Sequence, residues 1–266
     1  MSRALKTLIC LTAISALTPA AHAAVPNGFK LQGTNWTCEV GGETVSGILL
    51  KPEGKGPFPA LLISHGKGGS VRGFTQQKAS QFVKEGFVCI GCNYTHAGEP
   101  GQRPGPGPAG QPGRGRSSPD DGASAKNIAR AVACLDILES LPEVDAKRIY
   151  GYGHSMGGFV TIGLAAEHPD RLKAAIVTGS GIAPQNGFPA PSREKATSIK
   201  TPFLMVHGDA DTTVRPEQSA ALKEVLDSKS IPNERHVLAG ASHNLDRDRP
   251  DEVFKLAKDW LKRHGA

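Results

Sequence analysis

The feature that most constrains this chain is the alternation of short apolar runs with longer stretches of helical periodicity. The clearest runs, each too short for a helix, are residues 60–64, 87–92, 174–178 and 202–207. Between two of them, Ile128, Val132 and Leu135 recur every three or four positions, which is the spacing of one helix face. Buried strands that alternate with helices favour a mostly parallel sheet covered by helices on both faces. The sequence therefore predicts an α/β fold.

The same criteria place the other elements. Residues 36–40 and 45–50 indicate a hairpin that turns at Gly41-Gly42. We expect further strands at residues 148–153 and 235–238, and further helices at residues 75–85 and 216–227. The last helix is expected to bury one face, made of Val253, Ala257, Trp260 and Leu261.

The first 23 residues have the three-part pattern of a signal peptide. Arg3 and Lys6 give a basic start, residues 7–17 are mostly apolar, and residues 21–23 (Ala-His-Ala) suit cleavage. We therefore expect residues 1–23 to be removed, residues 24–266 to form a single domain, and the protein to be secreted or periplasmic. No membrane span is expected, because no stretch approaches about 20 uninterrupted apolar residues.

Charge and cysteine content exclude several partners. Without Arg3 and Lys6 the formal net charge falls from +6 to +4 (29 basic against 25 acidic residues), and no basic patch with aromatic residues accompanies it. Nucleic acid is therefore not an expected partner. The remaining cysteines are Cys38, Cys89, Cys92 and Cys134. Export permits disulfides, but four cysteines allow three pairings and the sequence favours none. Their spacing fits no zinc site, and nothing indicates a metal or an organic cofactor.

Residues 153–157 read Gly-His-Ser-Met-Gly and match the G-x-S-x-G pattern of a nucleophile elbow. In such an elbow a strand turns sharply into a helix, and small residues on both sides let the backbone close around a strained serine. A predicted strand precedes the motif and residues 159–168 suit a helix, which is the context that the motif requires. Ser155 is the predicted nucleophile.

A serine hydroxyl needs a base to take its proton and a carboxylate to orient that base. Predicted strands after Ser155 run into loops that carry Asp209 and Asp211, and then His243. Asp211 is the predicted acid, because it lies farther into its loop, where it can reach an imidazole; Asp209 is expected to support the turn. His243 is the predicted base. Packed or solvated roles are expected for four rival histidines, which are His154, His168, His207 and His236.

Acyl transfer also needs donors for the negative charge on the carbonyl oxygen. The backbone N–H of Met156 is one predicted donor, and the glycine-rich residues 65–69 after an early strand supply the second at Lys67, with Gly68 as the alternative. Gly68 is also expected to touch substrate. Residues 97–119 hold seven glycines and six prolines and must form a loop. With Tyr94 and His96 this loop is expected to line the mouth of the site, although a tolerated surface insertion explains its composition equally well.

With these motifs the chain resembles the dienelactone hydrolase and prolyl-oligopeptidase-like branch of the α/β hydrolases. The resemblance covers roughly residues 45–265 and rests on residues 65–69, 153–158, 207–214 and 241–243. It implies an α/β-hydrolase catalytic domain over residues 24–266 and favours Asp211, through the H-G-x-x-D pattern. Dienelactone hydrolases use a cysteine nucleophile, whereas this chain has Ser155. Residues 153–158 are also similar to the elbow of secreted cutinase-like polyester hydrolases.

The predicted function is hydrolysis of a small or polymeric carboxylic ester through an acyl-enzyme on Ser155, with no cofactor. Residues 180–200 are too few for a large lid domain, which indicates an open site. A serine peptidase, an acyltransferase or a polyester hydrolase could use the same three residues. A non-catalytic binding protein on this scaffold would need none of them. The oligomeric state stays open.

Overall fold

The computed structural model describes residues 24–97, 118–183 and 189–266. The predicted signal peptide over residues 1–23 lies outside the described residues, and so does most of the predicted loop over residues 97–119.

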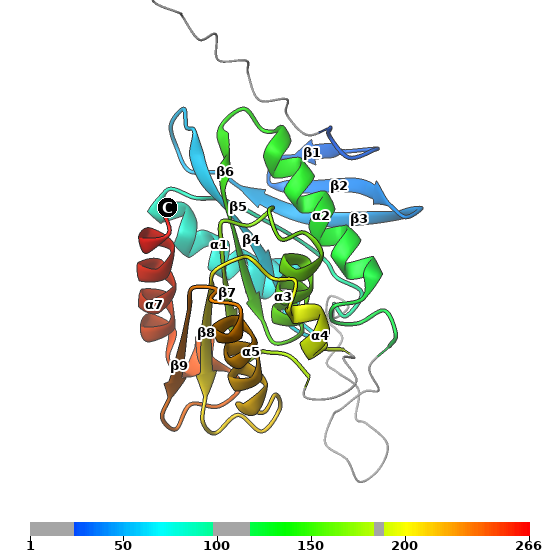
Figure 1. The fold of residues 1–266 in the computed structure, drawn as a ribbon. Coiled ribbons are helices and arrows are strands. Elements are labelled where there is room, and N and C mark those ends of the chain that lie inside the picture. Colours follow the sequence, from blue (N-terminus) through cyan, green and yellow to red (C-terminus); the bar gives the residue numbers. More distant parts are fainter. Residues whose placement is uncertain (1–23, 98–117, 184–188) are drawn as a thin grey trace, which may run out of the picture.

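A single twisted sheet organises the described part of the chain (Figure 1). Its strand order is β1-β2-β3-β5-β4-β6-β7-β8-β9. The strands are β1 (Lys30–Gln32), β2 (Asn35–Val40), β3 (Glu43–Leu50), β4 (Phe58–Ser64), β5 (Val88–Cys92), β6 (Val144–His154), β7 (Ala174–Thr178), β8 (Phe203–Gly208) and β9 (Asn233–Leu238). Strands β5, β4, β6, β7, β8 and β9 pair in parallel, and β1, β2 and β3 extend the sheet in antiparallel register. The parallel strands therefore all end at one edge, which we call the carboxyl edge.

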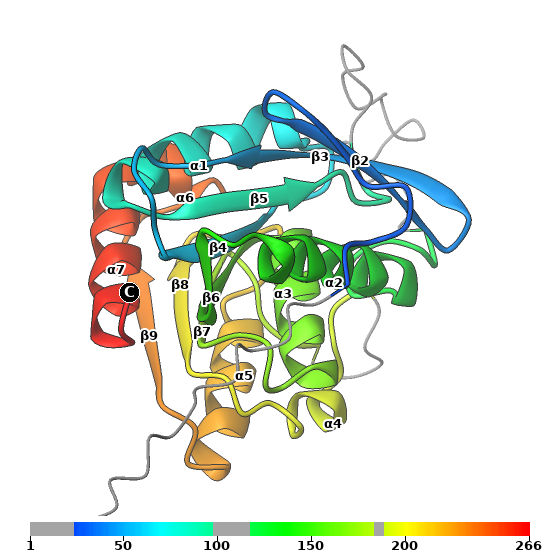
Figure 2. The ribbon, with the colours of Figure 1, turned by 90° about the horizontal axis from the view of Figure 1, so that it is seen from above.

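Helices cover both faces of the sheet, and Figure 2 shows the two groups on opposite sides. One face carries α1 (Gln76–Phe82), α6 (Leu245–Asp248) and α7 (Pro250–Arg263), together with the single turns Val71–Thr75 and Val83–Glu85 that flank α1. The other face carries α2 (Ala125–Ser140), α3 (Met156–Glu167), α4 (Arg193–Ala196) and α5 (Glu217–Ser228). This arrangement confirms the predicted α/β fold, which is that of the α/β hydrolases.

Side chains of the central strands alternate between the two cores. In β4, Leu61 and Ile63 pack with α1 and α7, whereas Ala60 and Leu62 pack with α2 and α3. Successive side chains of a strand point to opposite faces, so a strand covered on both faces reads as one continuous apolar run. The predicted buried face of the last helix is confirmed, because Val253, Ala257, Trp260 and Leu261 are all buried.

The cysteines of the described residues are all buried. Cys38, Cys89, Cys92 and Cys134 carry free thiols, two of them within β5. None of the three pairings that the sequence left open is formed. Buried thiols at these positions pack as small apolar side chains.

Among the described residues, no helix combines the length and the apolar character that crossing a membrane requires. The same residues contain no cluster of three or more histidine, cysteine, aspartate or glutamate side chains suited to a metal ion.

Candidate active site

Ser155 lies in the turn between β6 and α3, at the carboxyl edge of the sheet. Its backbone is strained, with φ 54° and ψ −122°. A Cβ atom at Gly157 would overlap the carbonyl oxygen of Ser64, and one at Gly153 would overlap the carbonyl oxygen of Gly157. Only glycine fits at these two positions, because β4 and β6 lie side by side and α3 starts immediately above them. The close approach holds the hydroxyl of Ser155 at the strand end.

His243 follows β9 and lies just before α6. Its Nε2 atom is 2.9 Å from the Oγ atom of Ser155, and its Nδ1 atom is 2.7 Å from Oδ2 of Asp211. Asp211, His243 and Ser155 therefore form one line of hydrogen bonds. The three residues are far apart in the chain, and the sequence predicts that they act together.

The carboxylate of Asp211 is fully buried and has a partner on each oxygen. Oδ1 accepts hydrogen bonds from the backbone N–H groups of Thr213 (2.8 Å) and Val214 (2.9 Å). Oδ2 faces His243 and also lies 3.2 Å from Nε2 of His207. Burial raises the pKa of Asp211, but the hydrogen bonds from the two imidazoles and from the amide of Val214 outweigh it and hold that pKa well below its ordinary value. Asp211 is therefore an anion at neutral pH.

An ionised Asp211 fixes the tautomer of His243. A carboxylate can only accept hydrogen bonds, so the Nδ1 atom of His243 must carry the proton that lies between the two groups. The Nε2 atom then has a free lone pair, which faces the hydroxyl of Ser155. In this state the imidazole can take the hydroxyl proton.

Asp209, the rival acid in the sequence, has a different partner. Its Oδ1 atom accepts a hydrogen bond of 2.7 Å from the backbone N–H of Gly240. This bond joins the loop after β8 to the loop after β9, just ahead of Asp211 and His243. Asp209 supports the turn, as the sequence predicts.

The other histidines near the site make contacts of their own. His154 is held 3.0 Å from the hydroxyl of Thr178, and burial lowers its pKa to about 4, so its ring is neutral at pH 7. His207 lies 2.9 Å from the carbonyl oxygen of Val214 through Nε2. His243 is the histidine that contacts Ser155.

The loop over residues 65–69 passes directly over the nucleophile. A Cβ atom at Gly66 would lie 3.1 Å from Cβ of Ser155. The N–H of Gly68 already donates to the carbonyl oxygen of His96, at 2.9 Å. This bond makes Gly68 a poorer donor for a carbonyl oxygen than a free amide would be.

Met156 is the first residue of α3, and its N–H is among those that a helix start leaves without an intrahelical acceptor. The first helical hydrogen bond runs from the N–H of Phe159 to the carbonyl oxygen of Ser155. The helix therefore provides no acceptor for the amide of Met156, as a donor to substrate requires.

Tyr94 and His96 are placed differently from the prediction. We expected both side chains to line the mouth of the site, but they are only 2% and 4% exposed. The hydroxyl of Tyr94 lies 2.8 Å from the hydroxyl of Ser64, and Nε2 of His96 lies 3.0 Å from the carbonyl oxygen of His65. Both side chains turn inward because these buried polar atoms find their partners beneath the loop over residues 65–69. They support that loop from behind.

Two further residues, for which the sequence predicted no role of their own, support the loop over residues 65–69. His65 accepts the N–H of Tyr94 at Nε2 (3.3 Å) and faces the carbonyl oxygen of Gly66 through Nδ1 (2.9 Å). The side-chain amide of Asn127 contacts Nδ1 of His96 (3.3 Å). The available signal for Asn127 in the sequence was its place directly before Ile128, the first residue of the apolar helix face.

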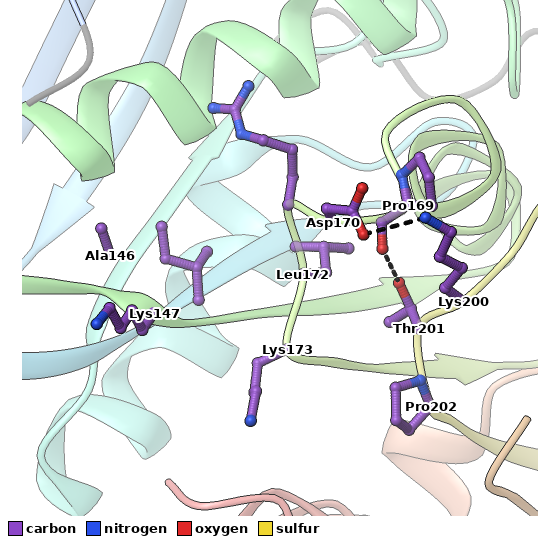
Figure 3. Close-up of a pocket in the computed structure, with 11 residues that line it drawn as sticks. Ala146, Lys147, Pro169, Asp170, Leu172, Lys173, Lys200, Thr201 and Pro202 are labelled. Carbon is purple, nitrogen blue, oxygen red and sulfur yellow. Dashed lines mark hydrogen bonds and ion pairs between the residues drawn. The ribbon is translucent and has the colours of Figure 1, made fainter. Parts of the chain in front are cut away.

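A separate hollow of about 430 Å³ lies at the opposite edge of the sheet (Figure 3). Its lining includes Lys147, Lys173 and Lys200, near the starts of β6, β7 and β8. Figure 3 shows Lys200 paired with Asp170, at 3.4 Å. Since Ser155 follows the far end of β6, this hollow is not part of the candidate active site.

Similar proteins were found by sequence and by structure. NocK of Nocardia uniformis subsp. tsuyamanensis, named as a candidate esterase, is 31% identical over 166 residues, which cover 62% of this chain and 42% of NocK. Dipeptidyl-peptidase 5 of Porphyromonas gingivalis is 23% identical over 84% of this chain and 36% of its own length. The chain thus spans less than half the length of these two relatives.

A solved structure of similar size shares the fold. It is a cold-adapted esterase from an Arctic intertidal metagenomic library, which superposes with a TM-score of 0.68 over 91% of this chain and 99% of the esterase, at 20% identity.

The sequence pattern of the dienelactone hydrolase family matches residues 45–264. The match begins in β3 and ends in the last turns of the chain, so it takes in every segment that contributes to the line from Asp211 to Ser155. The chain belongs to the dienelactone hydrolase family.

Proposed function

We propose that this protein hydrolyses carboxylic esters through an acyl-enzyme formed on Ser155. The observation that carries the proposal is the unbroken line of hydrogen bonds from Asp211 through His243 to the hydroxyl of Ser155. A protein that only binds a ligand needs neither this line nor a strained serine at a strand end.

The mechanism follows from the proton positions. Oγ of Ser155 attacks the ester carbonyl while its proton moves to Nε2 of His243. The amides of Met156 and Lys67 donate to the oxyanion of the tetrahedral intermediate. The intermediate collapses, the C–O bond to the alcohol breaks, and the alcohol leaves with the proton from His243. Water then attacks the acyl-enzyme with His243 again as the base, which releases the acid and restores Ser155.

Labelling and turnover test this proposal together. We expect a fluorophosphonate probe to label Ser155 and the protein to hydrolyse short-chain nitrophenyl esters. Ser155→Ala should lose both properties and keep its melting temperature. Ser228→Ala, at an exposed serine that ends α5, is the matched control and should keep both. An unchanged rate in Ser155→Ala would rule out the proposed nucleophile.

A peptidase is the second candidate, favoured by the similarity to dipeptidyl-peptidase 5 over 84% of the chain. The same three side chains could cleave an amide, whose nitrogen would leave with the proton from His243. Comparing kcat/KM for nitrophenyl esters and for aminoacyl and dipeptidyl nitroanilides separates the two. An esterase is expected to prefer the esters by more than their higher intrinsic reactivity explains.

We also propose that the protein is exported after removal of residues 1–23. The support is the order of basic, apolar and small residues in that segment. Expressed in a bacterial host, the mature protein should begin at Ala24 and be found outside the cytoplasm, as read from its intact mass in each cell fraction. A chain that keeps residues 1–23 and stays in the cytoplasm would contradict export.

A further inference from the structure

A buried ion pair lies behind the candidate active site, formed by Lys78 of α1 and Asp246 of α6. The Nζ atom of Lys78 is 2.5 Å from Oδ1 of Asp246, and their side chains are only 3% and 13% exposed. Lysine and aspartate are rarely buried to this degree in globular proteins. Asp246 follows His243 by three residues, so the pair connects the loop of His243 to a helix from a distant part of the chain.

The same carboxylate also reaches the strand of the nucleophile. The hydroxyl of Tyr152 donates to Oδ1 of Asp246 at 3.1 Å, and Tyr152 lies in β6 three residues before Ser155. The ammonium group of Lys78 lies 5.6 Å from the centre of the ring of Tyr152. One carboxylate oxygen thus joins α1, β6 and the loop that carries His243.

A stack of rings connects this junction to His243. The ring of His154 lies 5.0 Å from the ring of His243, and its other neighbour is the ring of Phe74, at 5.5 Å and nearly parallel. Nδ1 of His154 is 4.0 Å from Oδ2 of Asp246, an oxygen that is buried and has no hydrogen-bond partner among the described residues. The ring of His243 therefore packs against the ring of His154, which in turn lies next to the carboxylate of Asp246.

Stability alone does not explain this ion pair. Removing two charges from water costs free energy that their attraction often fails to recover, and apolar side chains of similar volume frequently stabilise a core as well or better. A hydrogen-bonded ion pair is directional, and in some proteins such a buried pair contributes to structural specificity rather than to stability. Here the ion pair joins α1 to α6, which directly follows the loop of His243, and the hydrogen bond from Tyr152 connects the same carboxylate to β6, the strand that leads to Ser155.

We propose that the Lys78–Asp246 ion pair is a positioning device for His243, holding its ring at hydrogen-bond distance from Ser155. This inference rests on the proposed function, because it assigns the pair a role in proton transfer between those two residues. Lys78 and Asp246 are positioning residues, since neither touches the hydroxyl that reacts.

The decisive variant replaces both charges, as Lys78→Met with Asp246→Leu. Its melting temperature should stay close to that of the wild type, because no buried charge is left unpaired and the only hydrogen bond that the described residues lose with the pair is the one from the neutral hydroxyl of Tyr152. We expect kcat to fall by about 10- to 100-fold, since a displacement of about 1 Å in a catalytic group can cost that much. KM should stay unchanged, and labelling of Ser155 by the fluorophosphonate should slow in parallel with kcat. If the pair served only stability, a double variant as stable as the wild type would instead keep the kcat of the wild type.

Two further variants keep the test decisive if the double variant does not fold. Tyr152→Phe removes one hydrogen bond to Asp246 and keeps the ion pair, so it should lower kcat by a smaller factor at unchanged KM. Lys255→Met with Asp259→Leu removes an exposed ion pair of 2.7 Å on α7 and should leave kcat unchanged.

The outcomes separate the two proposals. Normal labelling and kcat in both the double variant and Tyr152→Phe would overturn the positioning role and leave the esterase proposal standing. A wild-type protein that is neither labelled nor active would overturn both. Slower labelling and a lower kcat in the folded double variant would establish the positioning role.

Discussion

Asp211 and Asp209 lie two residues apart in one loop and have opposite relations to the imidazole of His243. Asp211 accepts a hydrogen bond from Nδ1–H of His243, whereas Asp209 accepts one from the N–H of Gly240 in the next loop. This difference makes the pair a natural comparison, because the same substitution at both positions changes the charge equally and affects the base at only one of them.

We predict that Asp211→Asn lowers kcat by about 10³- to 10⁴-fold, as the equivalent change does in serine proteases. An asparagine amide can donate to Nδ1 and so favour the tautomer whose Nε2 carries the proton, which leaves the hydroxyl of Ser155 without a base. Asp209→Asn keeps an oxygen that can accept the N–H of Gly240, so its kcat should stay close to that of the wild type. Steady-state kinetics on a nitrophenyl ester measure both, and equal losses would contradict the assignment of Asp211 as the acid.

At the scale of the element, the loop over residues 65–69 is positioned by hydrogen bonds from behind and by close packing in front. His96, in the segment after β5, contacts the carbonyl oxygen of His65 within the loop, and Asn127 of α2 contacts His96 from behind. In front, Gly66 lies against the nucleophile elbow. The position of the proposed donor at Lys67 therefore depends on Gly66 having no side chain.

We predict that Gly66→Ala lowers kcat by about tenfold or more, because its Cβ would press on Ser155 and move the loop that carries an oxyanion donor. Gly73→Ala is the matched control, since a Cβ there meets its nearest atom, the hydroxyl of Ser70, at an ordinary 3.8 Å. Both variants should fold. A fall in kcat of the same size in Gly73→Ala would show that the effect is not specific to the loop over the nucleophile.

The strands and helices that could be predicted have a strong apolar pattern. The elements that were not predicted lack such a pattern. β1 is a pair-forming strand of three exposed residues, and α4 and α6 are only four residues long. The helix expected over residues 75–85 is divided among α1 and two single turns. Whether such short segments form strands or helices depends on their tertiary contacts, which the local sequence pattern does not indicate.

Individual site residues followed the same division. Ser155, Asp211 and His243 could be predicted because each lies in the turn or loop that follows a strand of the parallel sheet, which fixes the edge where it lies. The inward direction of Tyr94 and His96 could not, because it depends on hydrogen bonds to Ser64 and His65 across the sheet. The ion pair between Lys78 and Asp246 could not be predicted either. Both residues lie in polar segments, and no neighbouring residue in the sequence indicates that either side chain is buried.

At the scale of the whole molecule, buried neutral histidines link stability to pH. His65 is fully buried, and its Nε2 atom accepts a backbone N–H, so protonation would break that hydrogen bond. Burial lowers the pKa of His65 to about 4. The unfolded chain therefore binds this proton at a higher pH than the folded protein does, and the stability that His65 contributes above about pH 6.5 is lost as the pH falls toward 4.

We predict that the free energy of unfolding falls by about 2 kcal/mol between pH 7 and pH 5 through His65 alone. Denaturant titrations at pH 7 and pH 5 measure this fall for the wild type and for each variant, and the contribution of His65 is the difference between the wild type and His65→Leu. His65→Leu should be less stable at pH 7 and should show a smaller loss on acidification than the wild type. His236→Gln, at a partly exposed histidine beside Glu234, should keep the full loss. An undiminished loss in His65→Leu would show that other groups cause the acid sensitivity.

The bond between Asp209 and Gly240 has a consequence for exchanging parts between relatives. It couples the loop after β8 to the loop after β9, because a graft of either loop alone keeps the hydrogen bond only where the incoming backbone brings an amide to the position of Gly240, which has a left-handed φ of 68°. Chimeras that transplant the segment around residue 243 by itself should therefore lose activity even when the incoming segment carries its own histidine. Transplanting both loops from one donor protein should preserve it.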